Sequence, residues 1–183
     1  PIILSLMLTS LAIGTVITMS STHWLMAWVG LELNTLSIIP IITKHHYPRS
    51  TEATTKYFLT QAAASAMLLF ASTVNAWHTG TWDISQLMNQ PACVMLTMAL
   101  SMKLGLAPLH FWLPEVLQGT SLSTALIITT WQKLAPMALM FLTHNSLNPM
   151  VLMAMGLLST LVGGWGGLNQ TQTRKIMAFS SIA

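Results

Sequence analysis

The chain carries very little charge. Only 6% of its 183 residues are Asp, Glu, Lys or Arg, whereas 53% are hydrophobic. Soluble domains carry about 25% charged residues, so this composition excludes an ordinary water-soluble protein and predicts an integral membrane protein in a lipid bilayer. The net charge of +3 comes from seven basic and four acidic residues. These are too few to form a nucleic-acid-binding surface, so we expect no nucleic-acid partner.

Cysteine is nearly absent as well. The single cysteine, Cys93, lies in an apolar stretch, which excludes an internal disulfide and an all-cysteine iron–sulfur cluster. The six histidines are not spaced as metal ligands. No glycine-rich nucleotide fingerprint follows a strand pattern. The sequence therefore predicts a chain with no metal and no redox cofactor of its own.

Six apolar segments are long enough to span a bilayer, and a seventh begins at Ile176. They cover approximately residues 2–20, 24–43, 56–77, 91–112, 122–142 and 149–168. No alternating β pattern occurs, so we predict one all-α polytopic transmembrane helix bundle over residues 1–183. Pro1 is not an initiator and Ala183 lies inside an apolar run, so we expect a fragment cut at both ends. No basic region precedes the first segment, so we do not interpret it as a signal peptide.

The basic residues of the connections fall on one side of the predicted bundle. Lys44, Arg49 and Lys56 follow the second segment, and Arg174 and Lys175 follow the sixth. Connections on the other side, including residues 78–90, contain no Lys or Arg. The positive-inside rule makes the cation-bearing side, called the basic face below, equivalent to the cytoplasmic side.

Lys103 is the first of three charged residues inside the apolar segments. It lies roughly 12 residues into its segment, about 18 Å along a helix and thus near the bilayer midplane. Its stem is too short to carry the ammonium the remaining ~15 Å to the headgroups. Gly105 and Pro108 follow, so we predict a Pro-interrupted helix near residues 103–114, buried in protein or lining a watery cavity. A buried amine beside a broken helix favours an ion or proton site, and a structurally paired lysine is the alternative.

Glu32 and Lys133 lie at a similar depth in the second and fifth segments. Glu32 could alternatively be a neutral acid bonded to backbone. Lys133, like Lys103, is followed closely by Ala-Pro. Three such charges facing lipid would cost roughly 8–10 kcal/mol, comparable to the net stability of a domain, so we expect them to point inward. A carboxylate keeps a buried amine charged and its withdrawal releases the proton, so these three residues could form a proton relay.

Two further expectations concern the surroundings of Lys103. We expect the Glu32 and Lys103 side chains to approach each other directly or through one water, since neither has another opposite charge at that depth in its own helix. His110 follows the break, between Pro108 and Trp112, where it could pass protons to water. An ordinary interfacial histidine is the alternative, and Trp112 is expected in the aromatic belt of the membrane boundary.

The third segment carries a polar stripe. Gln61, Ser65 and Ser72 fall on one helical face of this alanine-rich segment. We interpret the stripe as a surface for close helix packing and interhelical hydrogen bonds, and only secondarily as a water path.

Long stretches of the sequence resemble the antiporter-like subunits of the membrane arm of mitochondrial respiratory complex I, the NADH–ubiquinone oxidoreductase. They are VGLELN at 29–34, PRSTEATTKYFLTQA at 48–62, MKLGLAPLHFWLPEV at 102–116, TWQKLAP at 130–136 and GGLNQTQTRKIMAFSSIA at 166–183. The resemblance covers nearly the whole chain and implies an antiporter-like, proton-translocating core subunit in the mitochondrial inner membrane. It matches Glu32 to the family's relay carboxylate, Lys103 to its broken-helix lysine and Lys133 to its connecting lysine. The basic face would then be the matrix side.

The resemblance also implies what lies outside this chain. NADH, FMN, iron–sulfur clusters and ubiquinone would be bound by partner subunits, and other membrane-arm subunits would be neighbours. This chain would belong to the enzyme without doing redox chemistry, and the family's second half, an inverted repeat, would follow Ala183. A subunit of the related multisubunit cation/proton exchangers is the alternative function. A purely structural helix bundle is a third, opposed by three ionisable residues near the midplane.

Overall fold

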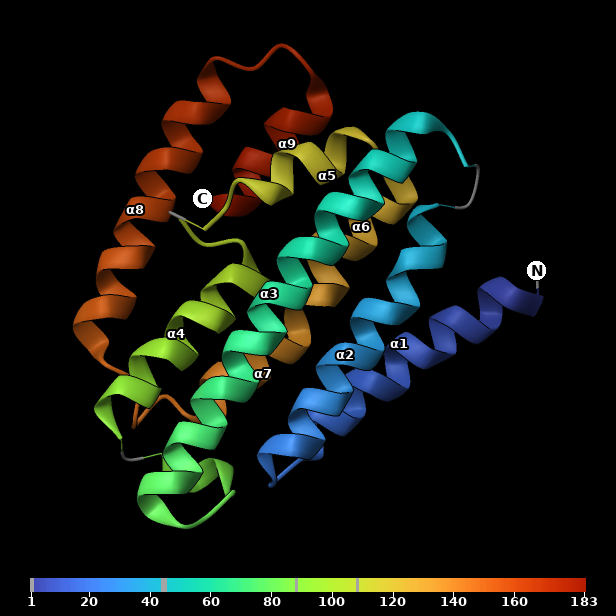
Figure 1. The fold of residues 1–183 in the computed structure, drawn as a ribbon. Coiled ribbons are helices and arrows are strands. Elements are labelled where there is room, and N and C mark those ends of the chain that lie inside the picture. Colours follow the sequence, from blue (N-terminus) through green and yellow to red (C-terminus); the bar gives the residue numbers. More distant parts are fainter. Residues whose placement is uncertain (1, 44–45, 88, 108) are drawn as a thin grey trace.

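The protein is a bundle of helices. The computed structural model describes residues 2–43, 46–87, 89–107 and 109–183. The elements in chain order are α1 (Ile2–Ser20), α2 (Trp24–Ile42), α3 (Pro48–Thr79), η1 (Ile84–Gln86), α4 (Gln90–Leu104), α5 (Trp112–Gln118), α6 (Leu122–Thr130), η2 (Trp131–Lys133), α7 (Leu134–Leu142), α8 (Pro149–Leu168) and α9 (Thr173–Ile182). Within the described residues, the strand-like pairing is limited to one isolated bridge between His23 and Asp83. The predicted all-α architecture is confirmed (Figure 1).

Five helical segments are long and apolar enough to cross a membrane, namely α1, α2, α3, the combined α6–α7 segment and α8. They correspond to five of the six predicted segments. The helix α3 begins at Pro48, eight residues before the predicted segment, because proline is well suited to the first turn of a helix. The helix α4 has only 15 residues, fewer than the roughly 20 that a span needs. The fourth predicted segment is therefore a short helix followed by a break.

The connections gather at two opposite ends of the bundle. In Figure 1 the start of α3, α5 and the α8–α9 turn lie at the upper end, whereas the connection after α3 lies at the lower end. At the lower end the Trp24 backbone N–H donates to the Trp82 carbonyl at 3.1 Å, which ties that connection to the α1–α2 turn. The predicted separation of basic and non-basic connections is therefore observed. One of the predicted loop cations, Lys44, lies outside the described residues.

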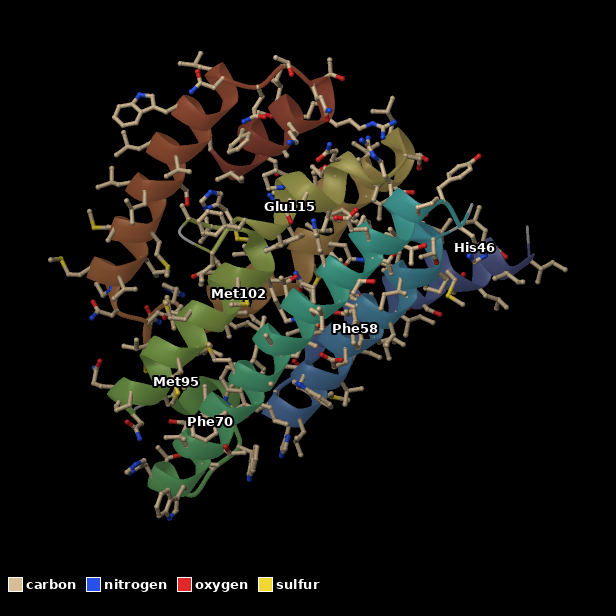
Figure 2. All side chains as sticks on the ribbon, turned by 45° about the horizontal axis from the view of Figure 1, so that its top comes forward. His46, Phe58, Phe70, Met95, Met102 and Glu115 are labelled. Carbon is tan, nitrogen blue, oxygen red and sulfur yellow. The ribbon has the colours of Figure 1, made fainter. Side chains whose placement is uncertain are left out.

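The core consists of two hydrophobic clusters stacked along the bundle. The lower cluster includes Trp24, Ile84 and Leu139, and the upper cluster includes Tyr57 and Leu113. The outer faces of the helices remain apolar, as lipid contact requires. For example, Phe58 and Phe70 on α3 are 43% and 58% exposed (Figure 2). The bundle is thus apolar outside as well as inside, and buried polar side chains need a separate explanation.

The helices α1 and α2 approach each other closely through glycines. A Cβ atom on Gly14 would lie 2.5 Å from the Asn34 Oδ1 atom, and one on Gly30 would clash with Thr18. Small residues at helix contacts are the usual way to pack helices in lipid, where no hydrophobic force drives association. This contact sets the position of α2, which carries Glu32 and Asn34.

Candidate functional site

A layer of polar side chains separates the two hydrophobic clusters. In α2, Leu31 belongs to the lower cluster and Ile38 to the upper one, and polar residues lie between them. The same order holds along α3, along α4 and α5, and along α6 and α7. In each case a residue of the lower cluster and a residue of the upper cluster lie on either side of the polar residues. These pairs are Leu68 and Tyr57, Leu100 and Trp112, and Ala135 and Ile128. The polar layer consists of Glu32, Asn34, Gln61, Lys103 and Gln132. Four separate parts of the chain therefore place polar groups at one level of the bundle.

The break after α4 positions Lys103. The helix ends at Leu104 because Gly105 adopts a left-handed conformation, with φ of 80°, which glycine enters without strain. The Trp112 indole then donates to the carbonyl of Met102 at 2.9 Å, and the Ala107 N–H donates to the Ser159 hydroxyl at 3.0 Å. The predicted interruption is confirmed at Gly105, and Pro108 lies outside the described residues. Trp112 is 6% exposed, so its predicted place in an interfacial belt is wrong.

Lys103 is buried and opens on a small polar cavity. Its side chain is 5% exposed, and its Nζ atom donates to Gln61 Oε1 at 3.5 Å. The cavity, called the Lys103 cavity below, has a volume of about 10 Å³, which is room for about one water molecule. Its polar lining also includes Asn34, Tyr57 and Gln132. The amine thus shares a water-sized space with polar groups of α2, α3 and η2.

Three of the lining residues have polar atoms with no hydrogen-bond partner among the described residues. They are Asn34 Oδ1, Gln61 Nε2 and Gln132 Nε2, all buried. Buried polar atoms nearly always have a hydrogen-bond partner, and in small polar cavities this is commonly a water. One acceptor, two amide donors and an amine can together hold a water, and the amine can exchange a proton with it. The predicted packing stripe of α3 therefore contributes to the site through Gln61.

The direct approach predicted for Glu32 and Lys103 is not observed, and their approach through one water stays a prediction. Within the described residues no ion pair or hydrogen bond joins them, and the ion pairs there link Lys56 to Glu52 and Glu115, each at 3.0 Å. The Glu32 Oε1 atom is buried without a hydrogen-bond partner among the described residues.

Helix geometry explains this difference. Residues 31, 34, 35 and 38 form the stripe of α2 that faces inward, and the first three of them line the Lys103 cavity. Glu32 lies one residue off this stripe, so its side chain leaves the helix about 100° away from that of Leu31. It stands beside the cavity instead of in it.

Lys133 follows Gln132 in the chain, and its side chain reaches α9 instead of the Lys103 cavity. Its Nζ atom donates to the Ser181 hydroxyl at 2.6 Å and to the Ser181 carbonyl at 3.3 Å, both on α9. The preceding turn is a 3₁₀ turn, because Pro136 has no N–H to bond the Gln132 carbonyl. Adjacent helical residues point in different directions, so Gln132 lines the Lys103 cavity while Lys133 reaches α9.

His110 lies inside the bundle. It is 7% exposed, its ring stacks on Phe111 with centroids 4.5 Å apart, and its Nδ1 atom is buried without a partner. The interfacial alternative is therefore wrong for this structure, and a role in proton transfer stays a prediction. Among the described residues, no three His, Cys, Asp or Glu side chains are grouped to hold a metal ion.

The sequence analysis did not single out Gln132, and it gave Gln61 a role in packing and interhelical hydrogen bonding, with a water path as the secondary interpretation. The sequence argument weighed the charged residues, because a charge at the membrane midplane costs more than an uncharged amide does. The available signal was position, because Gln132 immediately precedes Lys133 and lies four residues before Pro136.

Comparison with known proteins gives consistent matches. Residues 21–183 match the family described as NADH:quinone oxidoreductase/Mrp antiporter, transmembrane. The NADH-ubiquinone oxidoreductase chain 2 of Salmo salar is 63% identical over 100% of this chain, and 52% of that protein is covered. The same-named chain of Xenopus laevis is also 63% identical over 100% of this chain, with 53% covered. The chain spans about half the length of the curated relatives it matches.

Solved structures share the fold. A chain of respiratory complex I from Thermus thermophilus superposes with a TM-score of 0.93 at 30% identity, covering 100% of this chain and 43% of that one. A chain of the Mrp complex from Dietzia sp. reaches 0.88 at 18% identity, covering 96% of this chain and 36% of that one. A chain of the archaeal membrane-bound sulfane sulfur reductase reaches 0.85 at 18% identity, covering 96% and 40%. The last two likenesses concern the fold alone.

Proposed function

The chain belongs to the NADH:quinone oxidoreductase/Mrp antiporter transmembrane family, and from this premise we propose that it is part of a proton-translocating subunit of respiratory complex I. The proposal places it as a multi-pass protein of the mitochondrial inner membrane, beside other membrane-arm subunits. NADH, FMN, iron–sulfur clusters and ubiquinone belong to partner subunits in this proposal. The names of the vertebrate relatives at 63% identity support it.

The observation that carries the proposal is the Lys103 cavity. A purely structural lysine would have its ammonium bonded to several protein acceptors. Within the part of the chain that the structure describes, Lys103 instead has one hydrogen bond, at 3.5 Å. It shares a cavity of about 10 Å³ with amide atoms that have no partner there. Hydrophobic clusters above and below this layer exclude other water. An amine in such a place can bind and release a proton locally.

The relay follows from the positions of the charged groups. In the proposed step, an N–H bond of the Lys103 ammonium breaks, the proton passes to a cavity water, and the electron pair stays on Nζ. The amides of Gln61 and Gln132 orient that water. Lys133 is the acceptor, on the α9 side of Gln132, and must be neutral to receive the proton. Glu32 modulates the step in this proposal, because an ionised carboxylate near a buried amine favours the protonated amine.

A subunit of a multisubunit cation/proton exchanger is the alternative function, favoured by the fold shared with the Mrp complex at a TM-score of 0.88. The identity to that chain is 18%, against 63% to the complex I relatives. These values favour the complex I subunit.

The variant Lys103→Met tests the proposed function. A thioether fills the buried site but carries no proton, so we expect the assembled complex to lose proton pumping coupled to NADH oxidation. The measurement is the number of protons translocated per NADH in sealed membrane vesicles. Lys175→Met is the matched control, since Lys175 lies outside the polar layer, and it should pump normally. Unchanged stoichiometry in an assembled Lys103→Met complex would refute the relay.

A further inference from the structure

A second, larger cavity opens on the basic face, far along the bundle from the polar layer. Its volume is about 460 Å³. It lies where the end of α2, the start of α3, the α5–α6 turn and the start of α9 meet, and Figure 1 shows α5 and α9 together at this end. Arg49 and Arg174 both line it, together with hydroxyl-bearing residues of the α5–α6 turn, Thr120 and Ser121. We call it the arginine cavity.

Within the described residues, no ion pair joins either arginine to a carboxylate. The chain has only four acidic residues. Glu52 and Glu115 both bind Lys56, Glu32 lies in the polar layer, and Asp83 lies at the opposite end of the bundle. The Arg174 guanidinium donates a hydrogen bond to a neutral acceptor, the Gln118 carbonyl, at 3.4 Å. Arg49 also lines a neighbouring cavity with Glu52 and Glu115, so its charge is partly compensated there. Among the described residues that line the arginine cavity itself, none is acidic.

The backbone adds positive potential at the same place. The helices α3, α6 and α9 begin at Pro48, Leu122 and Thr173, next to the cavity. A helix start carries roughly half a positive charge from its free N–H groups. At the start of α9 the capping residue, Gln172, makes no side-chain bond to these groups. Arginines, hydroxyls and helix starts together match the chemistry of a phosphate group.

An apolar groove continues from the arginine cavity. It has a volume of about 190 Å³ and is lined by residues of α5, α6 and α9, including Leu122, Leu126 and Met177. These three are 62%, 61% and 55% exposed. Arg174 lines both the groove and the arginine cavity. A positively charged cavity joined to an apolar groove at a membrane boundary can bind a single ligand that has an anionic head and a hydrocarbon tail.

We propose that this composite site binds an anionic phospholipid, with its phosphate between Arg49 and Arg174 and one acyl chain in the groove along α6. Basic pockets between transmembrane helices on the positively charged side of a membrane protein are suited to such headgroups. The groove extends from Arg174 to Thr129, four residues before Lys133. The acyl chain then covers α6 on the side that leads to the polar layer. This inference is independent of any proton relay.

Photocrosslinking in the assembled complex tests the site. The probes are phosphatidic acid and phosphatidylcholine with the same diazirine-bearing acyl chain, and labelled peptides of α6 and α9 are quantified by mass spectrometry. We expect selective labelling by phosphatidic acid. Arg49→Gln with Arg174→Gln should lower it about tenfold or more, since each basic residue contributes about 1 kcal/mol toward anionic lipid. The control Lys175→Gln removes a neighbouring charge that does not line the cavity and should leave labelling unchanged.

A second variant tests the groove for the acyl chain separately from the arginine cavity for the phosphate. Leu126→Trp narrows the groove and keeps both arginines, so it should reduce labelling of α6 in a complex that still assembles. Equal labelling by the two lipids, or labelling that persists in the double arginine variant, would overturn the proposal. Competition by inorganic phosphate as effective as that by unlabelled phosphatidic acid would assign the site to a free anion instead. If the crosslinks are absent because another protein segment fills the groove, the proposal of a phospholipid site is also overturned.

Discussion

Replacing Gln132 by leucine separates a functional role of the polar layer from a structural one. The Gln132 Nε2 atom is buried without a protein partner, so Gln132→Leu breaks no recorded protein hydrogen bond of that atom. Leucine has a similar size, and we expect the free energy of unfolding to change by no more than about 1 kcal/mol. A buried water typically makes about three hydrogen bonds, and losing one costs roughly 1–1.5 kcal/mol. Proton transfer through the Lys103 cavity should therefore slow about five- to tenfold.

The assay compares proton pumping with NADH oxidation in sealed vesicles that contain the assembled complex. We expect Gln132→Leu to assemble normally and to pump more slowly at a given NADH oxidation rate. Gln172→Leu is the matched control, because Gln172 is an exposed residue at the start of α9 and lies outside the polar layer. Normal pumping by an assembled Gln132→Leu complex would refute the assignment of this amide to the relay. Failure of both variants to assemble would point to general damage.

Three other substitutions test other parts of the structure. Gly105→Ala strains a left-handed backbone and should destabilise the break by about 1–3 kcal/mol, measured as a lower thermal transition of the complex with weaker pumping; an unchanged transition would show that the φ of 80° is not required. Gly30→Val should clash with Thr18, separate α1 from α2 and lower the yield of assembled complex, which a native gel would show; a normal yield would contradict the close contact. Lys133→Ala removes the bonds to Ser181 and should reduce pumping while assembly stays largely intact, and full pumping stoichiometry would exclude Lys133 as the acceptor.

Much of the architecture could be predicted from the sequence because bilayer physics leaves few alternatives. Long apolar runs define the spans, and α1 and α8 begin and end at the predicted residues. The depth of Lys103 in its segment, followed by Gly105, correctly indicated a buried amine at a helix break. Both inferences depend only on distance along the chain and on the cost of charge in lipid.

The partners inside the polar layer could not be predicted in the same way. Which side chains meet depends on the rotation of each helix about its own axis, and a shift of one residue turns a side chain by about 100°. That rotation places Gln61, and not Glu32, in contact with Lys103. Gln132 lies in a 3₁₀ turn four residues before Pro136, and this turn was not inferred from the sequence. Opposite charge alone was therefore a poor guide to contact.

The central claim is that Lys103 exchanges its proton with a water held in the Lys103 cavity. A structure of the assembled complex, at a resolution where ordered waters are visible, tests it most directly. We expect density for a water within about 3.2 Å of Lys103 Nζ, also bonded to the amide of Gln61 or Gln132. A cavity without water, in which Lys103 Nζ is bonded only to protein groups, would contradict the claim.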